Sequence, residues 1–240
     1  MNIQNLLKLD PFNVNKKRKE LLFKKQISLL TNHHYKNCEN YRKILKNLNF
    51  LKAQEITLEN LPPLPANIFK KFDLKSVPNN KIFKKLTSSG TSNQQPSKIY
   101  LDKENALNQT KVLTKIVSKL VGSKRLPMLI IDKNPKNLNR ETFSARIAAI
   151  YGFSIFGKNH CYLLKENNQI DYKSLINFLN LYSKEKFLIF GFTSLVFENL
   201  IKKISKKQLK INFSNGILLH GGGWKKLENM KISNDKFKKK

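Results

Sequence analysis

Three short runs of apolar residues in the second half of the chain restrict its fold more than any other feature. They are Leu126–Ile131, Phe187–Phe190 and Gly216–Leu219, and segments with helical apolar spacing separate them. Continuous apolar runs of this length are typical of strands that are buried on both faces, as in a parallel sheet. We therefore predict an α/β fold with a mostly parallel sheet flanked by helices.

The helices of this region are predicted from their apolar spacing and from their capping residues. Asp102 and Asp171 are expected as N-caps, and Gly122 and Gly152 are expected just beyond helix ends. A further cap is predicted at Thr193 or Ser194. The predicted helices cover residues 103–121, 142–151, 172–182 and 194–204.

A helical lead-in precedes this region. Apolar residues recur with helical spacing over residues 16–30 and 36–48, and a short helix is expected over 66–72. We therefore predict two parts, a helical N-terminal segment over residues 1–80 that packs on the core and an α/β nucleotide-binding core over 81–240.

Several residues of the lead-in could be given chemical roles, but simpler assignments are favoured. His33-His34 would need a third metal ligand, so we predict an exposed connection between two helices there. Cys38 lies on an apolar stripe and is expected in the core. Phe69 and Phe72 of the short helix are expected to point inward.

Polar and small residues follow the three apolar runs, at Asp132, Gly191–Thr193 and His220–Gly223. In parallel sheets the ligand crevice lies at the carboxyl ends of the strands. Three glycines after His220 allow the backbone to approach a planar or anionic ligand closely. A flexible turn is the alternative, and we favour a binding site because a buried strand runs directly into these residues.

The stretch Leu86–Tyr100, LTSSGTSNQQPSKIY, is rich in Thr, Ser, Gly, Asn and Gln, and a β-type run lies on each side of it. Consecutive N–H groups around Gly90 can form a concavity that binds anionic oxygens, and Lys98 adds a positive charge for phosphate. The spacing differs from that of the phosphate loop G-x-x-x-x-G-K-[ST]. Composition alone supports a polar hairpin loop equally well.

The formal net charge of +30 admits two explanations. A basic surface can bind nucleic acid, acidic lipid or an acidic partner. Alternatively, an AT-rich genome inflates the lysine content. Only five of the 46 basic residues are Arg, the residue that nucleic-acid readers prefer, and the Lys residues are scattered along the chain. We therefore favour the compositional explanation and expect no nucleic-acid partner.

The two cysteines, Cys38 and Cys161, lie far apart and do not have the spacing of a metal site. Neither a secretory signal nor an apolar stretch long enough to span a membrane is apparent in the sequence. We expect a reduced, cytoplasmic protein without a membrane span.

Two motifs carry a resemblance to a known family. Thr87–Ser92 followed by Pro96-Ser97-Lys98 resembles the ATP-phosphate signature of the adenylate-forming superfamily, whose usual form is Ser/Thr-Ser-Gly-Thr-Thr-Gly and then Pro-Lys. Asn93 stands where Gly is usual, and Ser97 separates Pro96 from Lys98. The string His220-Gly-Gly-Gly-Trp-Lys, together with this signature, resembles the LuxE-type acyl-protein synthetases from about Leu61 onward.

The resemblance implies an incomplete form of the large domain of adenylate-forming enzymes and an ATP-dependent ligase. Such a ligase activates a carboxylic acid, expected to be a fatty acid, as the acyl-adenylate and passes the acyl group to the thiol of an acceptor protein, such as a reductase or carrier. Lys98 and His220 are the implied catalytic residues, and the implied cofactors are ATP and Mg²⁺. The implied nucleotide-binding residues are Thr87, Ser88, Ser89, Gly90, Thr91, Gly221, Gly222 and Gly223.

Beyond Trp224-Lys225 the family pattern continues with a Tyr-Gly-x-Thr-Glu-like stretch, an Asp for the ribose and a small C-terminal domain, none of which this sequence contains. We therefore expect a C-terminally incomplete core, and its activity alone is left open. The alternatives are a CoA ligase of the phenylacetate–CoA ligase type, a non-catalytic fragment and a basic polyanion-binding module. The adenylation hypothesis requires the turn near Gly90 and the glycines after His220 to face one nucleotide cleft.

Overall fold

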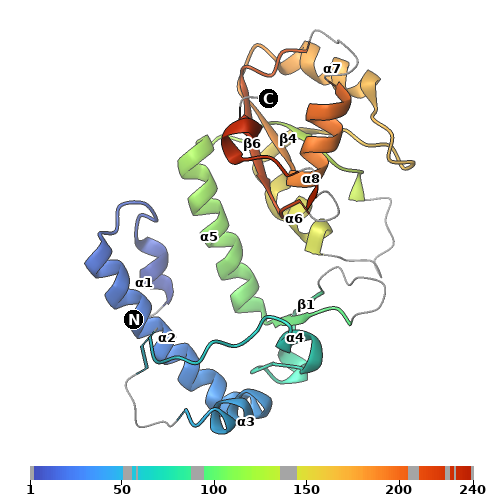
Figure 1. Ribbon diagram of the computed structural model, residues 1–240. Coiled ribbons are helices and arrows are strands. Elements are labelled where there is room, and N and C mark those ends of the chain that lie inside the picture. The colour runs from blue at the N-terminus through green and yellow to red at the C-terminus, as the bar shows by residue number, and fades with distance from the viewer. Residues whose placement is uncertain are drawn as a thin grey trace. The chain divides into compact units, whose positions relative to one another are not determined.

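The computed structural model of this chain describes residues 3–50, 56–57, 59–87, 95–135, 145–204, 211–224, 228–229 and 231–238. Figure 1 shows the path of its helices and strands. In chain order they are α1 Ile3–Lys8, α2 Lys16–Asn37, α3 Glu39–Asn47, α4 Ile68–Lys71, η1 Asn79–Lys81, β1 Lys84–Thr87, β2 Lys98–Leu101, α5 Lys103–Val121, β3 Leu126–Ile130, α6 Ala145–Ser154, β4 Gly157–Tyr162, α7 Tyr172–Tyr182, β5 Phe187–Phe192, α8 Thr193–Leu195, η4 Val196–Lys203, β6 Gly216–Gly221 and α10 Asn234–Lys238. The element η1 is a 3₁₀-helix and η4 is a π-helix.

The chain forms two compact units. Unit 1 comprises Met1–Leu120 with Phe143–Ala145, and unit 2 comprises Val121–Thr142 with Arg146–Lys240. The division expected from the sequence, between residues 80 and 81, stays a prediction.

Unit 2 contains a four-stranded sheet in the order β4-β3-β5-β6, and every pair of neighbouring strands is parallel. Strands β3, β5 and β6 are the three apolar runs of the sequence. Because parallel neighbours need crossover connections, helices α6, α7 and α8 lie between the strands along the chain. The predicted fold class, a mostly parallel sheet flanked by helices, is confirmed.

The core of unit 2 is built from the inward residues of the sheet and of the helices that follow its strands. Leu129, Leu175, Phe187 and Val196 are fully buried in it. Burial of such side chains stabilises a fold by roughly 1.5–3 kcal/mol each. Strands β3 and β5 therefore belong to the best-packed part of this unit. The expectation that a buried strand runs into His220 is wrong, because β6 is an edge strand whose residues are only partly buried or exposed.

Unit 1 is built from helices and one hairpin. Helices α2 and α3 pack on each other, and β1 and β2 form a separate two-stranded antiparallel sheet that leads into α5. The backbone N–H of Asn105 donates to the Asp102 carboxylate over 2.7 Å, and Gly122 has a φ of +94°. The predicted N-cap and the glycine beyond the end of α5 are therefore confirmed.

His33 and His34 are exposed as predicted, but the prediction that they connect two helices is wrong. Helix α2 continues through both residues to Asn37, and α3 begins at Glu39. Neither Gly nor Pro occurs between Thr31 and Asn37, so the sequence holds no helix breaker there. The chain turns only at Cys38, whose backbone is extended, and Cys38 is buried as predicted.

Three local predictions also differ from the structure. Helix α6 passes through Gly152 and ends at Ser154, because a single glycine weakens a helix without stopping it. Helix α4 is a single turn that buries Ile68 and leaves Phe69 and Phe72 38% and 43% exposed. The residue before α8 is Phe192, so neither Thr193 nor Ser194 is the N-cap.

Within the described ranges, none of the helices combines the length and apolar character that a membrane span requires.

Candidate functional site

The polar stretch near Gly90 connects the two strands of the hairpin in unit 1. Strand β1 pairs antiparallel with β2, and Thr87 lies opposite Lys98 at the end of the ladder. Both residues therefore stand at the mouth of the connecting segment, as their expected role in phosphate binding requires. The other expected phosphate-binding residues, Ser88, Ser89, Gly90 and Thr91, lie outside the described residues.

Lys98 is held at the hairpin mouth by a carboxylate. Its Nζ atom lies 3.4 Å from Oδ1 of Asp73, and the Tyr100 hydroxyl donates to the same oxygen over 3.0 Å. The hydrogen bond from Tyr100 and the charge of Lys98 hold the pKa of Asp73 below its usual value. Asp73 thus orients Lys98 and occupies the place that an anionic ligand would take beside it.

Two further lysines surround the same aromatic ring. The Nζ atoms of Lys75 and Lys85 lie 5.7 and 5.8 Å from the centre of the Tyr100 ring, within cation–π range. Lys75 also donates to the side-chain oxygen of Asn79 over 2.6 Å, and among the described residues only Lys98 forms an ion pair with Asp73. The excess of positive charge makes the hairpin mouth attractive to phosphate.

The second predicted motif lies at the carboxyl end of β6 in unit 2, as expected. His220 pairs with Gly191 and Gly221 with Phe192 of the neighbouring strand β5. The Thr193 hydroxyl lies 3.0 Å from Nδ1 of His220 and donates to the carbonyl oxygen of Gly221 over 3.1 Å. The hydroxyl that the sequence suggested as a helix cap instead fixes the end of β6.

These two contacts define the state of the His220 ring. The Thr193 hydroxyl has one proton, so when it donates to Gly221 it must accept from Nδ1–H of His220. Desolvation lowers the pKa of His220, which favours this neutral form. The ring also stacks on Phe237, with 4.8 Å between centroids. Nε2 is then the acceptor nitrogen, a group that can face the acyl side of a substrate.

The three glycines that follow His220 meet different surroundings. Gly222 has a φ of +87°, and a Cβ there would lie 2.5 Å from Cδ1 of Phe192. Gly223 has a φ of +68°, but a Cβ there would meet open space, as it would at Gly221. The fold therefore requires Gly222 itself, whereas the open space at Gly221 and Gly223 fits the expected approach of a ligand.

Trp224 is a packing residue. Its side chain is buried, and its ring lies edge-on to Phe197 with 4.9 Å between centroids and to Phe237 with 6.1 Å. The Trp of the His-Gly-Gly-Gly-Trp-Lys string thus anchors the glycine segment in the core of unit 2.

An ion pair at the end of β3 was missed from the sequence. Nε of Arg146 donates to Oδ2 of Asp132 over 2.6 Å, and a second guanidinium nitrogen contacts Oδ1. Asp132 is buried, and a buried carboxylate needs a partner of this kind. An Asp directly after a buried strand indicates that a basic residue lies nearby, but the sequence does not identify that residue as Arg146.

Neither cysteine suits the role of an acyl acceptor. Cys38 is only 4% exposed. Burial raises the pKa of the Cys161 thiol to about 11, so very little reactive thiolate exists at neutral pH. The acceptor thiol implied by the resemblance is therefore not supplied by Cys38 or Cys161.

The expected Mg²⁺ finds no ready-made protein site in the described part of the chain. Within those residues, no three or more His, Cys, Asp or Glu side chains gather where they could hold a metal ion. A basic hairpin mouth with one carboxylate fits the phosphates of a nucleotide better than it fits a bare cation. A magnesium ion would thus be bound chiefly through phosphate oxygens.

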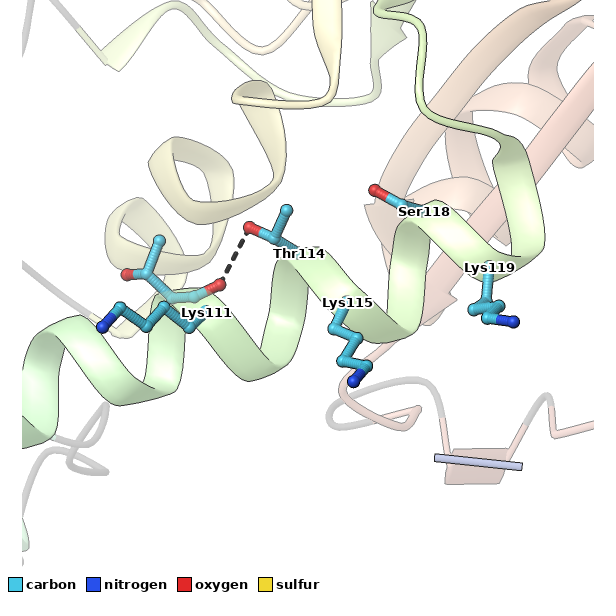
Figure 2. A pocket seen from close by; sticks show the side chains of 6 residues that line it. Lys111, Thr114, Lys115, Ser118 and Lys119 are labelled. Atoms are coloured by element: carbon cyan, nitrogen blue, oxygen red, sulfur yellow. Dashed lines mark hydrogen bonds between the residues drawn. The ribbon is translucent and has the colours of Figure 1, made fainter. Parts of the chain in front are cut away.

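A concavity of about 530 Å³ along α5 is a weaker candidate (Figure 2). In Figure 2 Lys115 and Lys119 point away from Thr114 and Ser118. Lys115 donates to the carbonyl oxygen of Leu7, and Lys119 pairs with Asp10. The Thr114 hydroxyl donates to a carbonyl of its own helix. These groups already serve the packing of unit 1, so they form no binding site.

The hairpin mouth belongs to unit 1 and His220–Gly223 belongs to unit 2. The requirement that both face one nucleotide cleft stays a prediction.

Comparison with known proteins adds to these observations. The family model "Acyl-protein synthetase, LuxE" matches residues 2–240. A comparison with curated proteins finds no match. Two solved structures of 2-hydroxyisobutyryl-CoA ligase resemble this chain in fold.

The structure of that ligase in the postadenylation state with 2-HIB-AMP has a TM-score of 0.62 and 13% identity, and the match covers 89% of this chain and 47% of that chain. The structure in the thioesterification state with 2-HIB-AMP and CoA has a TM-score of 0.60 and 12% identity, with coverages of 87% and 44%. The chain thus spans less than half the length of these structures. At this identity the likeness shows a shared fold.

Proposed function

Because the chain belongs to the LuxE family of acyl-protein synthetases, we propose that it acts in the ATP-dependent activation of a carboxylic acid as an acyl-adenylate. The acid is proposed to be a fatty acid, and the acceptor of the acyl group is a thiol of another protein. We also propose a cytoplasmic location, because Cys38 and Cys161 are both free thiols.

The observation that carries this proposal is the charge at the hairpin mouth. Lys98 lies opposite Thr87 at the end of β1 and pairs with Asp73, and the ammonium groups of Lys75 and Lys85 lie 5.7 and 5.8 Å from the centre of the neighbouring Tyr100 ring. Activation of a carboxylic acid brings an anionic acid close to a polyphosphate. A cluster of fixed positive charge lowers the cost of that approach.

In the proposed reaction a carboxylate oxygen of the acid attacks the α-phosphorus of ATP. The bond from that phosphorus to the β-phosphate bridging oxygen breaks, and pyrophosphate leaves with the electron pair. We assign Lys98, Thr87 and the Ser88–Thr91 stretch to the β- and γ-phosphates. Magnesium, when bound to the nucleotide, neutralises further phosphate charge.

In unit 2, the proposal assigns Gly221–Gly223 to the nucleotide or adenylate and His220 to the acyl group. The open space at Gly221 and Gly223 supports close approach by a ligand. The neutral His220 ring, held through Nδ1 by Thr193, would accept a hydrogen bond through Nε2. These roles require positioning and not proton transfer.

ATP binding and acid-dependent ATP–pyrophosphate exchange test the proposal. With a panel of fatty acids we expect exchange, and Lys98→Ala should weaken ATP binding by about tenfold to a hundredfold, the loss expected for one charged hydrogen bond. Lys81→Ala is the matched control, because Lys81 is exposed and belongs to the same unit. It should change binding less than about twofold.

Three outcomes would contradict or redirect the proposal. Absence of exchange with every acid, in protein that binds ATP, would leave only a nucleotide-binding module. A product that forms only with CoA would replace the protein acceptor by CoA. Equal losses for both lysine variants, with tight salt-dependent binding of DNA, would favour the polyanion-binding alternative.

A further inference from the structure

Unit 1 contains a largely apolar pocket whose residues are not among those assigned above to ATP or to the acyl group. Its volume is about 320 Å³, within the range of about 300–1,000 Å³ of small-molecule sites. Residues from α2, from α3, from the segment 61–64, from α4 and from residues 74–76 line it. All of these segments belong to unit 1, so the pocket is formed within one compact body.

Most residues that line the pocket are apolar. Cys38 is 4% exposed and Leu30 is 52% exposed, while Phe69 is 38% exposed although sequence analysis had expected it to point inward. Large apolar side chains exposed beside a concavity are typical of a binding site, because burial of them by a ligand is favourable.

Four residues with polar side chains also line this pocket, and a hydrogen bond joins two of them, Thr31 and Tyr41. Nδ1 of His34 and Oγ of Ser76 lie 2.7 Å apart, although the two residues are far apart in the sequence. Burial lowers the pKa of His34, and the neighbouring His33 lowers it further, so the ring is neutral near pH 7. A neutral imidazole joined to a hydroxyl can both donate to a ligand and accept from it.

We propose that this pocket binds a medium-chain carboxylic acid, with its alkyl chain against Leu30, Leu64 and Phe69 and its carboxyl group at the His34–Ser76 pair. Largely apolar walls that also carry the His34–Ser76 pair fit an amphipathic ligand. The net charge of +30 favours an anionic head group over a cationic one. The choice of an acid among anionic amphipaths rests on the proposed function.

Calorimetry with decanoate, in the absence of ATP, tests this site on the whole chain. We expect saturable binding of one decanoate, with affinity that rises by up to about fourfold per methylene from hexanoate to decanoate. Leu30→Asp should weaken decanoate binding by about tenfold or more, because a carboxylate would then stand against the chain. Ser76→Ala should weaken the binding of decanoate more than the binding of 1-decanol, which lacks the carboxyl group.

Leu29→Asp is the matched control. Leu29 is the neighbour of Leu30 on α2 and is 50% exposed, but it does not line the pocket. It should bind decanoate as the unchanged protein does. Equal losses of decanoate affinity for Leu30→Asp and Leu29→Asp would overturn the inference, and so would an affinity that does not depend on chain length. It would also be overturned if decanoate failed to bind and the protein instead self-associated through this face, with Leu30→Asp abolishing the self-association.

The outcome can be separated from that of the proposed function. If decanoate does not bind while ATP–pyrophosphate exchange is seen with other acids, the pocket inference fails and adenylation stands. If decanoate binds at this site but no acid supports exchange, the pocket stands and adenylation fails.

Discussion

The residues at the end of β6 have different structural roles. His220 and Thr193 are joined side chain to side chain, whereas Gly222 is defined by its backbone and by the closeness of Phe192. Gly221 and Gly223 have open space where a Cβ would be. Three identical residues in the sequence therefore have different structural roles.

Alanine substitutions at the three glycines should reveal this difference. Gly222→Ala should destabilise unit 2 by about 2 kcal/mol or more, because both the positive φ and the contact with Phe192 oppose a Cβ. Gly223→Ala should cost about 1 kcal/mol through its φ alone. Gly221→Ala should change stability by less than about 0.5 kcal/mol.

Urea unfolding followed by the fluorescence of Trp224 measures these changes, because Trp224 is the sole tryptophan and is buried in unit 2. Equal losses for all three substitutions would contradict the interpretation. Under the proposed function Gly221→Ala should weaken ATP binding although it spares stability, and Gly223→Ala should weaken ATP binding although it costs less stability than Gly222→Ala.

At the scale of elements, an ion pair joins α6 to the end of β3. Arg146 of α6 donates to both oxygens of the buried Asp132. Apart from Arg146, the backbone N–H of Lys133 also donates to this carboxylate. The pair thus ties a helix to the edge of the sheet where ligands bind in folds of this class.

Arg146→Ala should destabilise unit 2 by on the order of 3 kcal/mol, because it leaves a buried carboxylate without its cation. Adding Asp132→Asn should restore part of that loss, since the buried charge is then removed. Urea unfolding provides the measurement.

Arg125→Ala is the control for this prediction. Arg125 is exposed and donates to the carbonyl oxygen of Ile155 over 3.0 Å, so its loss should cost less than about 1 kcal/mol. A loss as large as that of Arg146→Ala, or no recovery in the double variant, would show that the buried charge is not the cause.

For the whole molecule, the two compact units indicate which fragments of the chain should fold independently. Unit 2 contains all four strands of the parallel sheet and its apolar core. The division from the sequence would instead keep the hairpin and α5 with the sheet. The two divisions predict different folding behaviour for fragments.

A fragment of residues 121–240 should fold cooperatively, with Trp224 as protected from solvent as in the whole chain, because its sheet and core are complete. Circular dichroism during heating and limited proteolysis measure this. A fragment of residues 81–240 is the comparison. If only the longer fragment folds, the boundary between residues 80 and 81 is the correct one.

Much of the fold could be predicted because its signals are local. Uninterrupted apolar runs such as Phe187–Phe190 fit a strand buried on both faces, and the side chain of Asp171 caps the helix after it as expected. Helix ends were less predictable. No residue near His33 indicated whether α2 continues there. The Thr193 hydroxyl is suited to cap a helix, but it donates to the carbonyl oxygen of Gly221 in β6 instead.

The sequence by itself determined the class of fold, the apolar runs that become strands β3, β5 and β6, and the positions of Lys98 and His220 next to strand ends. Only the tertiary structure decided that Asp73 orients Lys98, that Thr193 fixes His220, and that Arg146 neutralises Asp132. The physical reason is distance along the chain. Apolar spacing and caps act within a few residues, whereas each of these partnerships joins residues that meet only once the chain has folded.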